Sequence, residues 1–316
     1  MTPLYAWALF AAAIVALLLL DLLVVHRSDK EMGVREALWW SLGWIVLALA
    51  FGAGVWAVRG ADAGQQFLAG YLIEKSLSVD NLFVFIVIFS GLGIAAKYQH
   101  KVLFWGILGA IVFRLIFIFG GIALLEQFHW IIYVFGAFLL YTAFKMWRND
   151  ESSADPQKNP LVRFLERHFP VDCAHQGPEF ILRRSGKVVF TSLALALVAV
   201  ESADLVFAVD SVPAVLAVSK DPFIVFTSNV FAILGLRSLY FALAGCVERF
   251  SYLHYGLAMV LGFVGVKMLL VDFIHVPVGL SIAIIVSLVG GSIAYSLYKT
   301  RDGACELPAE VAPEAE

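Results

Sequence analysis

Long apolar segments separated by short polar connections recur along the whole chain. Nine such segments are long enough to cross a bilayer as a helix, which takes about 20 apolar residues. The pattern therefore predicts an all-α polytopic membrane protein with nine transmembrane helices. The first segment has no basic start and no small-residue cleavage pattern, which favours a retained span over a signal peptide. The nine ranges are 4–25, 37–58, 67–92, 101–125, 129–147, 188–218, 223–246, 252–272 and 277–298.

Composition agrees with this class. The 316 residues are 61% hydrophobic and only 15% charged, far from the profile of an ordinary soluble domain. The three cysteines, Cys173, Cys246 and Cys305, are widely separated and form no Cys-x-x-Cys motif. Neither a disulfide framework nor a dithiol redox centre is indicated. We find no Gly-rich phosphate-binding motif, so ATP is not the evident energy source.

The basic residues predict how the chain is oriented. Of the 22 Lys and Arg, five lie within the apolar segments and fifteen of the others fall on one side of the predicted topology. Only Arg59 and Lys220 fall on the other side. Lys and Arg favour cytoplasmic connections, so we predict an external N-terminus and a cytoplasmic C-terminus. The connection between the fifth and sixth segments is then cytoplasmic, with an amphipathic piece at 161–169 and a small β-hairpin at 180–190.

An internal repeat relates the third to fifth segments to the sixth to eighth. Five residues recur in the second unit with every interval preserved, and the correspondence extends to Arg114 and Arg237, and to Asp80 and Asp210. A unit of three spans makes its second copy enter the membrane from the opposite side, which is the inverted-repeat plan of secondary transporters. The recurring residues are Glu126, Phe128, Tyr133, Lys145 and Met146, matched by Glu248, Phe250, Tyr255, Lys267 and Met268.

The repeat divides the chain into six regions. We predict two peripheral N-terminal helices, a first three-helix repeat, a cytoplasmic loop, a second three-helix repeat, a final helix and a disordered cytoplasmic tail. The tail consists largely of Ala, Pro and Glu and carries few large apolar groups that would form a core. In that order, the regions are 1–66, 67–147, 148–187, 188–273, 274–299 and 300–316.

Three carboxylates lie within one apolar run at 200–213, namely Glu201, Asp204 and Asp210. A carboxylate at the centre of a membrane helix costs roughly 2.5 to 3.5 kcal/mol on insertion scales, so each needs a partner, a proton or a bound cation. Glu201 and Asp204 share a helix face, whereas Asp210 lies about 120° from Asp204 around an unbroken helix. Because Pro213 leaves the carbonyl four residues before it without a donor, we predict a helix break there.

Five acids are expected to gather between the repeats, where such transporters bind their substrates. Neutral oxygens of Asn81 and Ser211 lie beside them in the sequence, and unwound backbone at Asp80 and Asp210 is expected to add carbonyl oxygens. Oxygen ligands without thiolate or imidazole suit divalent ions such as Mn²⁺, Mg²⁺ or Ca²⁺. We assign the role of metal ligands to Glu74, Asp80, Glu201, Asp204 and Asp210.

An inert network is the alternative reading. The five candidate acids are matched in number by five bases within the spans, so complete pairing would balance their charge, and buried ion pairs do occur for packing or specificity alone. We expect Arg114 and Arg237 to act as counter-charges of the acids, since both lie near mid-span. Thr227 and Asn229 are interpreted as helix-packing hydrogen-bonding residues in preference to ligands.

Three stretches carry a resemblance to a known family. Residues 70–85 read GYLIEKSLSVDNLFVF, residues 201–214 read ESADLVFAVDSVPA, and residues 221–241 read DPFIVFTSNVFAILGLRSLYF. These stretches resemble the TerC family, closest to its Alx branch. The resemblance implies a bacterial inner-membrane protein linked to manganese efflux or, in other branches, to tellurite resistance, and Alx-like proteins have been labelled redox modulators.

Together these features predict a secondary transporter that exports Mn²⁺ through the five acids and is coupled to protons. We expect it not to be an enzyme, to hold no tightly bound cofactor and to bind no nucleic acid. Its partners are then the lipid bilayer, a divalent metal ion and protons, while protein partners are unknown. The alternatives are a non-transporting membrane scaffold and a tellurium-resistance or redox-modulating protein whose ion pairs are structural.

Overall fold

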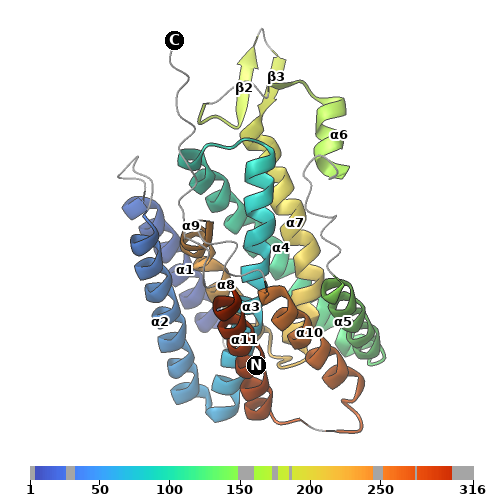
Figure 1. Cartoon of the computed structure of the whole chain (residues 1–316). Helices are drawn as coiled ribbons and strands as arrows, with labels where there is room; N and C mark the ends of the chain where they lie inside the picture. Colours follow the sequence, from blue (N-terminus) through green and yellow to red (C-terminus); the bar gives the residue numbers. More distant parts are fainter. Residues whose placement is uncertain are drawn as a thin grey trace.

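The computed structural model describes residues 4–25, 33–148, 160–172, 177–184, 187–244, 252–274 and 276–300. Each predicted apolar range overlaps a helix, and Figure 1 shows these helices packed side by side as a bundle. The helices are α1 (Leu4–Val25), α2 (Val34–Arg59), α3 (Ala61–Gly91), α4 (Ala96–Gln127), α5 (Ile131–Trp147), α6 (Pro160–His168), α7 (Ser192–Leu216), α8 (Pro222–Leu234), α9 (Leu236–Ala244), α10 (Leu253–Leu269) and α11 (Val278–Lys299).

Five helical stretches of the described chain are long and apolar enough to cross a membrane. These are α2, α4, α7, α11 and the stretch Pro222–Ala244 that α8 and α9 form together. Shorter apolar helices occur at Leu4–Leu19, Ile131–Trp147 and Leu253–Leu269. The predicted helical membrane protein is therefore confirmed, whereas the crossing of the bilayer by all nine ranges stays a prediction.

The predicted helix at 223–246 is divided in two at Gly235. A Cβ atom added there would lie 3.0 Å from Lys75 Nζ and 3.1 Å from Trp44 Cβ, so glycine allows α2 and α3 to approach the break. Lys75 Nζ donates a 3.3 Å hydrogen bond to the carbonyl of Ala232 in the last turn of α8. The lysine thus satisfies an oxygen at a helix C-terminus, where a positive charge is also favourable.

Helices α3 and α7 are continuous at the positions where unwound backbone was expected. Asp80 lies inside α3, and α7 runs through Asp210 and Pro213 to Leu216. The predicted helix break is therefore wrong. Pro213 lies in the last turn of α7, where its fixed φ fits a helix and only one turn of backbone remains to be accommodated. The carboxylates of Asp204 and Asp210 accordingly stay on different faces of one helix.

The packing of the helices is reciprocal between the two predicted repeats, in which α3, α4 and α5 correspond to α7, α8 with α9, and α10. Helix α3 packs on α8 and α10, as its counterpart α7 packs on α4 and α5, and α5 packs directly on α10. A Cβ atom added to Gly262 would lie 3.8 Å from Ala143 Cβ, and one added to Gly265 would lie 3.0 Å from Leu140 Cγ. Leu140 and Ala143 correspond to Gly262 and Gly265 through the 122-residue interval of the repeat, so the two contacts join equivalent positions.

A small subdomain joins the two predicted repeats. It contains α6 and a three-stranded sheet of β1 (Val171–Asp172), β2 (Ile181–Arg184) and β3 (Lys187–Thr191), in the order β1-β3-β2. Strands β2 and β3 are antiparallel and β1 is parallel to β3. The predicted hairpin and amphipathic piece are both present, and in Figure 1 they lie at the end of the bundle where α7 begins.

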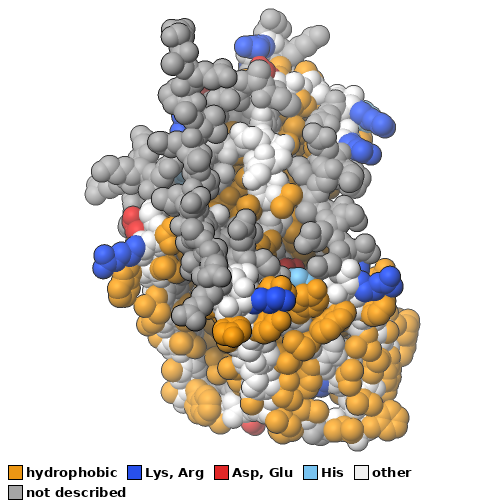
Figure 2. Space-filling model, in the orientation of Figure 1, with side chains coloured by type: hydrophobic (Ala, Val, Ile, Leu, Met, Phe, Trp, Pro, Cys, Tyr) orange, Lys and Arg blue, Asp and Glu red, His pale blue; other side chains and the backbone are white. Residues whose placement is uncertain are grey.

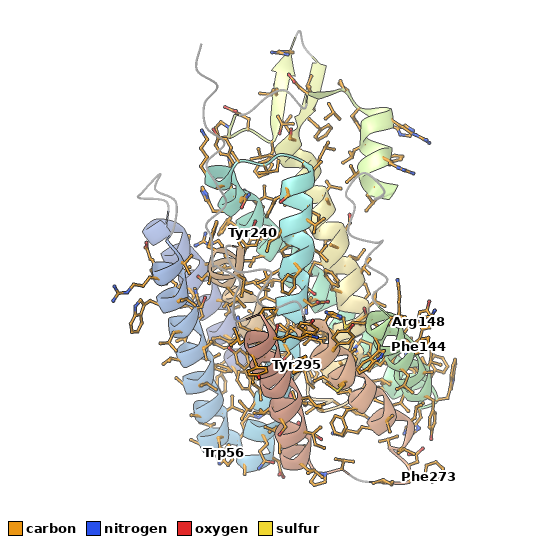
Figure 3. The ribbon with its side chains drawn as sticks, in the orientation of Figure 1. Trp56, Phe144, Arg148, Tyr240, Phe273 and Tyr295 are labelled. Carbon is orange, nitrogen blue, oxygen red and sulfur yellow. The ribbon has the colours of Figure 1, made fainter. Side chains whose placement is uncertain are left out.

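Hydrophobic and basic side chains are unevenly distributed along the bundle. Arg59 donates a 2.5 Å hydrogen bond to Asp221, so the connections that follow α2 and α7 meet at one end, as the predicted topology requires. In Figure 3, Trp56 and Phe273 lie toward that end, whereas Arg148 and Phe144 lie higher on α5. Figure 2 shows that hydrophobic side chains dominate the lower part of this face, and most of its Lys and Arg lie above them.

Candidate functional site

An ion-pair network of three helices lies inside the bundle. Arg114 of α4 donates from Nη1 to Glu74 Oε1 of α3. It also donates side-on to both carboxylate oxygens of Asp204 in α7, with Nη2 3.2 Å from Oδ1 and Nε 3.5 Å from Oδ2. The side chains of Glu74 and Arg114 are fully buried, and that of Asp204 is nearly so. Glu74 and Asp204 each precede the matched aspartate of their predicted repeat by six residues, so one arginine joins corresponding acids of the two predicted repeats.

Two neutral side chains complete this group. Arg114 Nη1 lies 3.0 Å from Ser211 Oγ and 3.4 Å from Asn229 Oδ1. Asn229 also donates from Nδ2 to Glu74 Oε2 at 2.9 Å, which turns its amide oxygen toward the guanidinium. We call the oxygen atoms of Glu74, Asp204, Ser211 and Asn229 that accept from Arg114 the oxygen cage.

Close helix packing places the oxygen cage. A Cβ atom added to Gly70 would lie 2.8 Å from Ser228 Oγ, so glycine one turn before Glu74 lets α3 approach α8 next to Asn229. On the other side, a Cβ atom at Gly121 would lie 2.9 Å from Leu216 Cδ1, which brings α4 close to α7. Small residues at such contacts let membrane helices pack backbone to backbone.

The oxygen cage lies between two buried apolar clusters. One cluster contains Ala110 of α4 and Val200 of α7, and the other contains Ile118 and Val212 of the same two helices. Arg114 and Asp204 lie between these positions along α4 and α7. The polar group is thus closed off by apolar layers along the helix axes, and in such surroundings electrostatic interactions are stronger than in water.

Glu201 lies one helical turn before Asp204 and outside the oxygen cage. Its carboxylate packs on the backbone of Gly109 in α4, in space that the Cβ atom of any other residue would occupy. Its buried Oε2 has no hydrogen-bond partner within the described chain. Glu201 is therefore a partly buried acid whose hydrogen-bonding capacity is not used up in this arrangement.

The matched aspartates lie apart from the cage and differ from each other. Asp210 accepts a 2.9 Å hydrogen bond from Thr142 of α5. Asp80 is partly buried, and no hydrogen bond or ion pair links it to another residue in the described ranges. Buried Asn81 likewise makes no hydrogen bond to any of the five acids. The continuous helices α3 and α7 explain this separation, since a shift of six residues turns the side chain to another face.

Arg237 lies in a different setting from Arg114. It is 2% exposed at the start of α9, directly after the helix break at Gly235. In the part of the chain that the structure describes, the ion pairs of the five acids involve Arg114 and not Arg237. The counter-charge expected of Arg114 is thus present as an ion pair with Glu74 and Asp204, whereas the same role for Arg237 stays a prediction.

Asn229 makes the hydrogen bond between helices that was expected of it, whereas Thr227 does not. It hydrogen-bonds Glu74 inside the oxygen cage, while Thr227 donates to the carbonyl of Phe223 and serves its own helix. Both lie in one apolar run, and their composition does not distinguish them. Their angular separation on α8 is about 160° because they are two apart on a helix with about 100° per residue, and only contact with α3 selects the face that carries Asn229.

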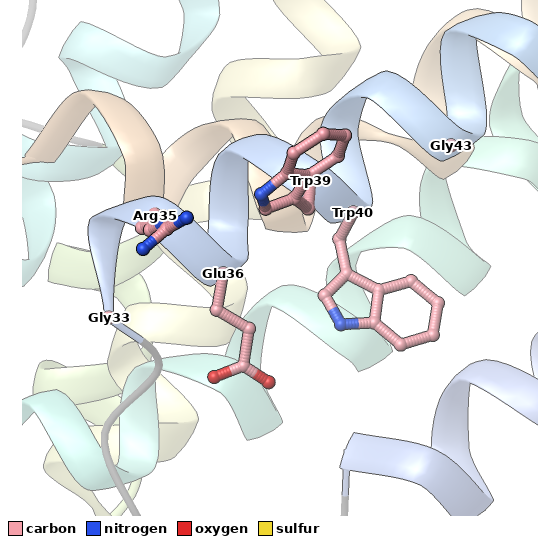
Figure 4. Close-up of a pocket in the computed structure, with 6 residues that line it drawn as sticks. All are labelled: Gly33, Arg35, Glu36, Trp39, Trp40 and Gly43. Atoms are coloured by element: carbon pink, nitrogen blue, oxygen red, sulfur yellow. The ribbon is translucent and has the colours of Figure 1, made fainter.

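The arrangement described by the structure holds a guanidinium, not a preformed metal centre. Among the described residues, no group of three or more His, Cys, Asp or Glu side chains is spaced to hold one metal ion. A surface hollow at the start of α2 is lined by none of the five acids (Figure 4). Its lining residues are Gly33, Arg35, Glu36, Trp39, Trp40 and Gly43.

The chemistry of the oxygen cage suits a cation. Two carboxylates, a hydroxyl and an amide oxygen all point at one positive group that is removed from water. Burying such charges is unfavourable unless they remain paired, and removal of one partner from a buried pair costs about 3–5 kcal/mol. These oxygens are therefore suited to a positive partner, which in this structure is the guanidinium of Arg114.

Comparison with known proteins identifies the family. The model of the "Integral membrane protein TerC family" matches residues 59–304. An "Uncharacterized membrane protein STKORF319" of Myxococcus xanthus is 52% identical over 295 residues, 93% of this chain and 92% of the relative. A "Putative membrane-bound redox modulator Alx" of Escherichia coli (strain K12) is 47% identical over 293 residues, 90% of this chain and 91% of the relative. No solved structure matches.

The family match covers α3 to α11, and so includes every residue of the oxygen cage, Glu201, Asp210 and Arg237. The relatives from M. xanthus and E. coli extend the similarity to more than nine-tenths of their own length. The resemblance of the three sequence stretches is thereby confirmed, and the chain belongs to the TerC family of integral membrane proteins.

Proposed function

We propose that this protein is a secondary transporter that exports divalent metal ions, with Mn²⁺ as the favoured substrate. The observation that carries the proposal is the oxygen cage, in which Glu74 and Asp204 face one buried cationic group between apolar layers. Acids inside a membrane protein are costly and commonly mark ion pathways. Their positions in matching helices of the two repeats put this group where transporters of that plan bind their substrates.

The ligand chemistry favours a hard or borderline divalent ion. Carboxylate, hydroxyl and amide oxygens suit Mn²⁺, Mg²⁺ and Ca²⁺, and the cage contains neither a thiolate nor an imidazole. The resemblance to the TerC family, which implies a link to manganese efflux, favours Mn²⁺ among these ions. We propose Glu74 and Asp204 as primary ligands and Ser211 as an auxiliary donor, while Asp80, Glu201, Asp210 and Asn81 contribute in other states of the transport cycle.

The proposed architecture has nine spans with two inverted three-helix repeats in the bacterial inner membrane. The reciprocal packing of α3 on α8 and of α7 on α4 supports the repeat. The contact between Arg59 and Asp221 supports the relative sidedness, because both residues belong to connections predicted to be external. An external N-terminus and a cytoplasmic C-terminus complete the proposal.

Export of a divalent ion requires an energy source. Moving two positive charges outward against an inside-negative potential costs roughly 4.6 kcal/mol per 100 mV. We propose inward proton movement as the coupled reaction, with one of the intramembrane acids as the proton acceptor. The protein would then be neither an enzyme nor the holder of a resident cofactor.

A second candidate function comes from the name of a relative. The E. coli relative is called a putative membrane-bound redox modulator. A non-transporting scaffold, or a protein of tellurium resistance, would use the same buried ion pairs for structure alone. Against a redox function stands the isolation of the three cysteines in the sequence. Against a purely structural role stands Glu201, whose buried oxygen has no hydrogen-bond partner within the described chain.

Ion flux into liposomes separates these functions. Purified protein is reconstituted with a metal-sensitive dye inside the vesicles, and Mn²⁺, Mg²⁺ and Ca²⁺ are added separately outside. The transporter proposal predicts a Mn²⁺ signal well above that of empty vesicles and acceleration by an opposing proton gradient. A scaffold or a redox modulator predicts the rate of empty vesicles with all three metals.

A further inference from the structure

Arg114 occupies the place where the proposed function needs a substrate ion. Its guanidinium accepts no hydrogen bond and donates to five oxygen atoms of the cage. We propose that Arg114 is a tethered cation that leaves the oxygen cage when a divalent metal ion enters and moves to Glu201. The inference rests on the proposed function and adds the residue that competes with the substrate.

Every carboxylate oxygen of Glu74 and Asp204 already accepts a hydrogen bond while Arg114 is docked. Arg114 donates hydrogen bonds to both oxygens of Asp204 and to Oε1 of Glu74. Asn229 donates one to the remaining oxygen, Oε2 of Glu74. A divalent ion prefers six or more oxygen ligands, or nearly ideal octahedral geometry. Entry of the ion therefore requires these same oxygens to be released by the guanidinium.

Charge balance favours an exchange of the two occupants. Glu74 and Asp204 bring two negative charges, so Arg114 leaves one of them unbalanced, whereas a divalent ion neutralises both. Guanidinium and metal in the cage together would leave one positive charge in excess in an environment of low dielectric. With the metal in the cage and the guanidinium at Glu201, three positive charges face three carboxylates.

Glu201 is suited to receive the displaced guanidinium. Its carboxylate packs on Gly109 of α4, the helix that carries Arg114. Glu201 lies one turn before Asp204 on the same face of α7, so its carboxylate is next to an acid that Arg114 already contacts. The buried Oε2 of Glu201 has no hydrogen-bond partner in the described residues, so it offers an acceptor without the loss of another contact. A third carboxylate next to the cage thereby keeps Arg114 paired in both states.

Mn²⁺ binding to the purified full-length protein in detergent tests this exchange. Docking of Arg114 lowers the apparent affinity by the fraction of molecules with a vacant cage. If that fraction is about 1–10%, Arg114→Gln binds Mn²⁺ about 10- to 100-fold more tightly than the wild type. Glu201→Gln binds it more weakly, because the guanidinium loses its alternative partner. Lys267→Gln is the control, since Lys267 donates to Ser281 outside the cage and its removal leaves the affinity unchanged.

The double variant decides whether Glu201 acts through Arg114. With Arg114→Gln already present, Glu201→Gln has no further effect on Mn²⁺ affinity if Glu201 only receives the guanidinium. An equal loss in both backgrounds would make Glu201 a direct ligand and overturn the inference. Unchanged or weaker binding by folded Arg114→Gln would also overturn it while leaving the proposed transport intact.

A more conservative variant covers the case in which Arg114→Gln does not fold. Arg114→Lys keeps the positive charge, but its ammonium group cannot donate to all the oxygen atoms that the planar guanidinium reaches. It should bind Mn²⁺ more tightly than the wild type, though less tightly than the Gln variant would, and an affinity equal to the wild type would contradict the exchange. Folded wild type and variants that all fail to bind Mn²⁺ would overturn both this inference and the proposed function.

Discussion

Gly136 of α5 and Gly265 of α10 meet backbone to backbone. A Cβ atom added to Gly136 would lie 3.0 Å from the carbonyl oxygen of Gly265, and one added to Gly265 would lie 2.9 Å from that of Gly136. Helices α5 and α10 correspond to each other in the repeat, so this contact lies close to the axis that would relate the two units. The two glycines set how closely the units approach.

Gly265→Ala should destabilise the protein through this contact. Its methyl group meets a backbone oxygen that cannot move without the whole helix, and overpacking of this kind costs about 1–3 kcal/mol. We expect a lower thermal unfolding midpoint in detergent. Gly262→Ala in the same helix is the matched control, because its Cβ atom would be 3.8 Å from Ala143 and in ordinary contact. Equal midpoints for the two variants would show that the close approach is not needed.

Gly109 should be as important for transport as the acid that packs on it. A methyl group at Gly109 occupies the space of the Glu201 carboxylate, so Gly109→Ala is expected to reduce Mn²⁺ flux as strongly as Glu201→Gln. Shortening the acid with Glu201→Asp should restore part of the flux in the Gly109→Ala background. Gly120→Ala is the control, since nothing lies within 4 Å of its Cβ atom. Undiminished flux in folded Gly109→Ala would rule this role out.

Asp80 and Asp210 are expected to be needed for flux and not for folding. In Asp80→Asn and Asp210→Asn the amide keeps the shape of the side chain but loses the charge, so each variant should fold and lose Mn²⁺ flux. In Asp210→Asn the amide oxygen can still accept the hydrogen bond from Thr142, so this contact should be kept. Flux and the yield of folded protein are measured together. Loss of folded protein in both variants would instead favour a structural role.

Topology reporters test the orientation of the repeats. A reporter after Arg301 is expected to be cytoplasmic and one at the N-terminus external, because the basic residues are distributed 15 to 2 between the two sides. A third reporter in the connection between Leu216 and Pro222 should be external, next to Arg59. Opposite signals from all three reporters would show that the chain has the reverse orientation in the membrane and would contradict the proposed topology.

Most of the helical fold could be predicted from hydrophobicity alone. The ranges 4–25 and 277–298 agree with α1 and α11 to within one residue at each end. Hydrophobicity did not indicate the break at Gly235, because a glycine in an apolar run is also tolerated inside a continuous helix. The break depends on Trp44 and Lys75, which approach from other helices and lie far away in the sequence.

The candidate site was predictable in its residue types but not in its geometry. The matched intervals identified Glu74, Asp204 and Arg114, which the structure joins. The expectation that Asp80 and Asp210 lie with them depended on unwound backbone, and α3 and α7 are continuous at these positions. Local sequence fixes the angle between two residues of one helix, whereas contacts between helices select which face becomes part of the site.

Removal of the cage acids tests the central proposal most directly. Glu74→Gln and Asp204→Asn are reconstituted in liposomes, and Mn²⁺ flux is driven by an opposing proton gradient. Asp272→Asn is the matched control, because Asp272 is an acid outside the cage that accepts a hydrogen bond from Tyr133. We predict that the wild type and the control concentrate Mn²⁺ and that both cage variants, folded by size-exclusion chromatography, lose this flux. Wild-type rates in the cage variants, or a wild type no faster than empty vesicles, would contradict the proposed function.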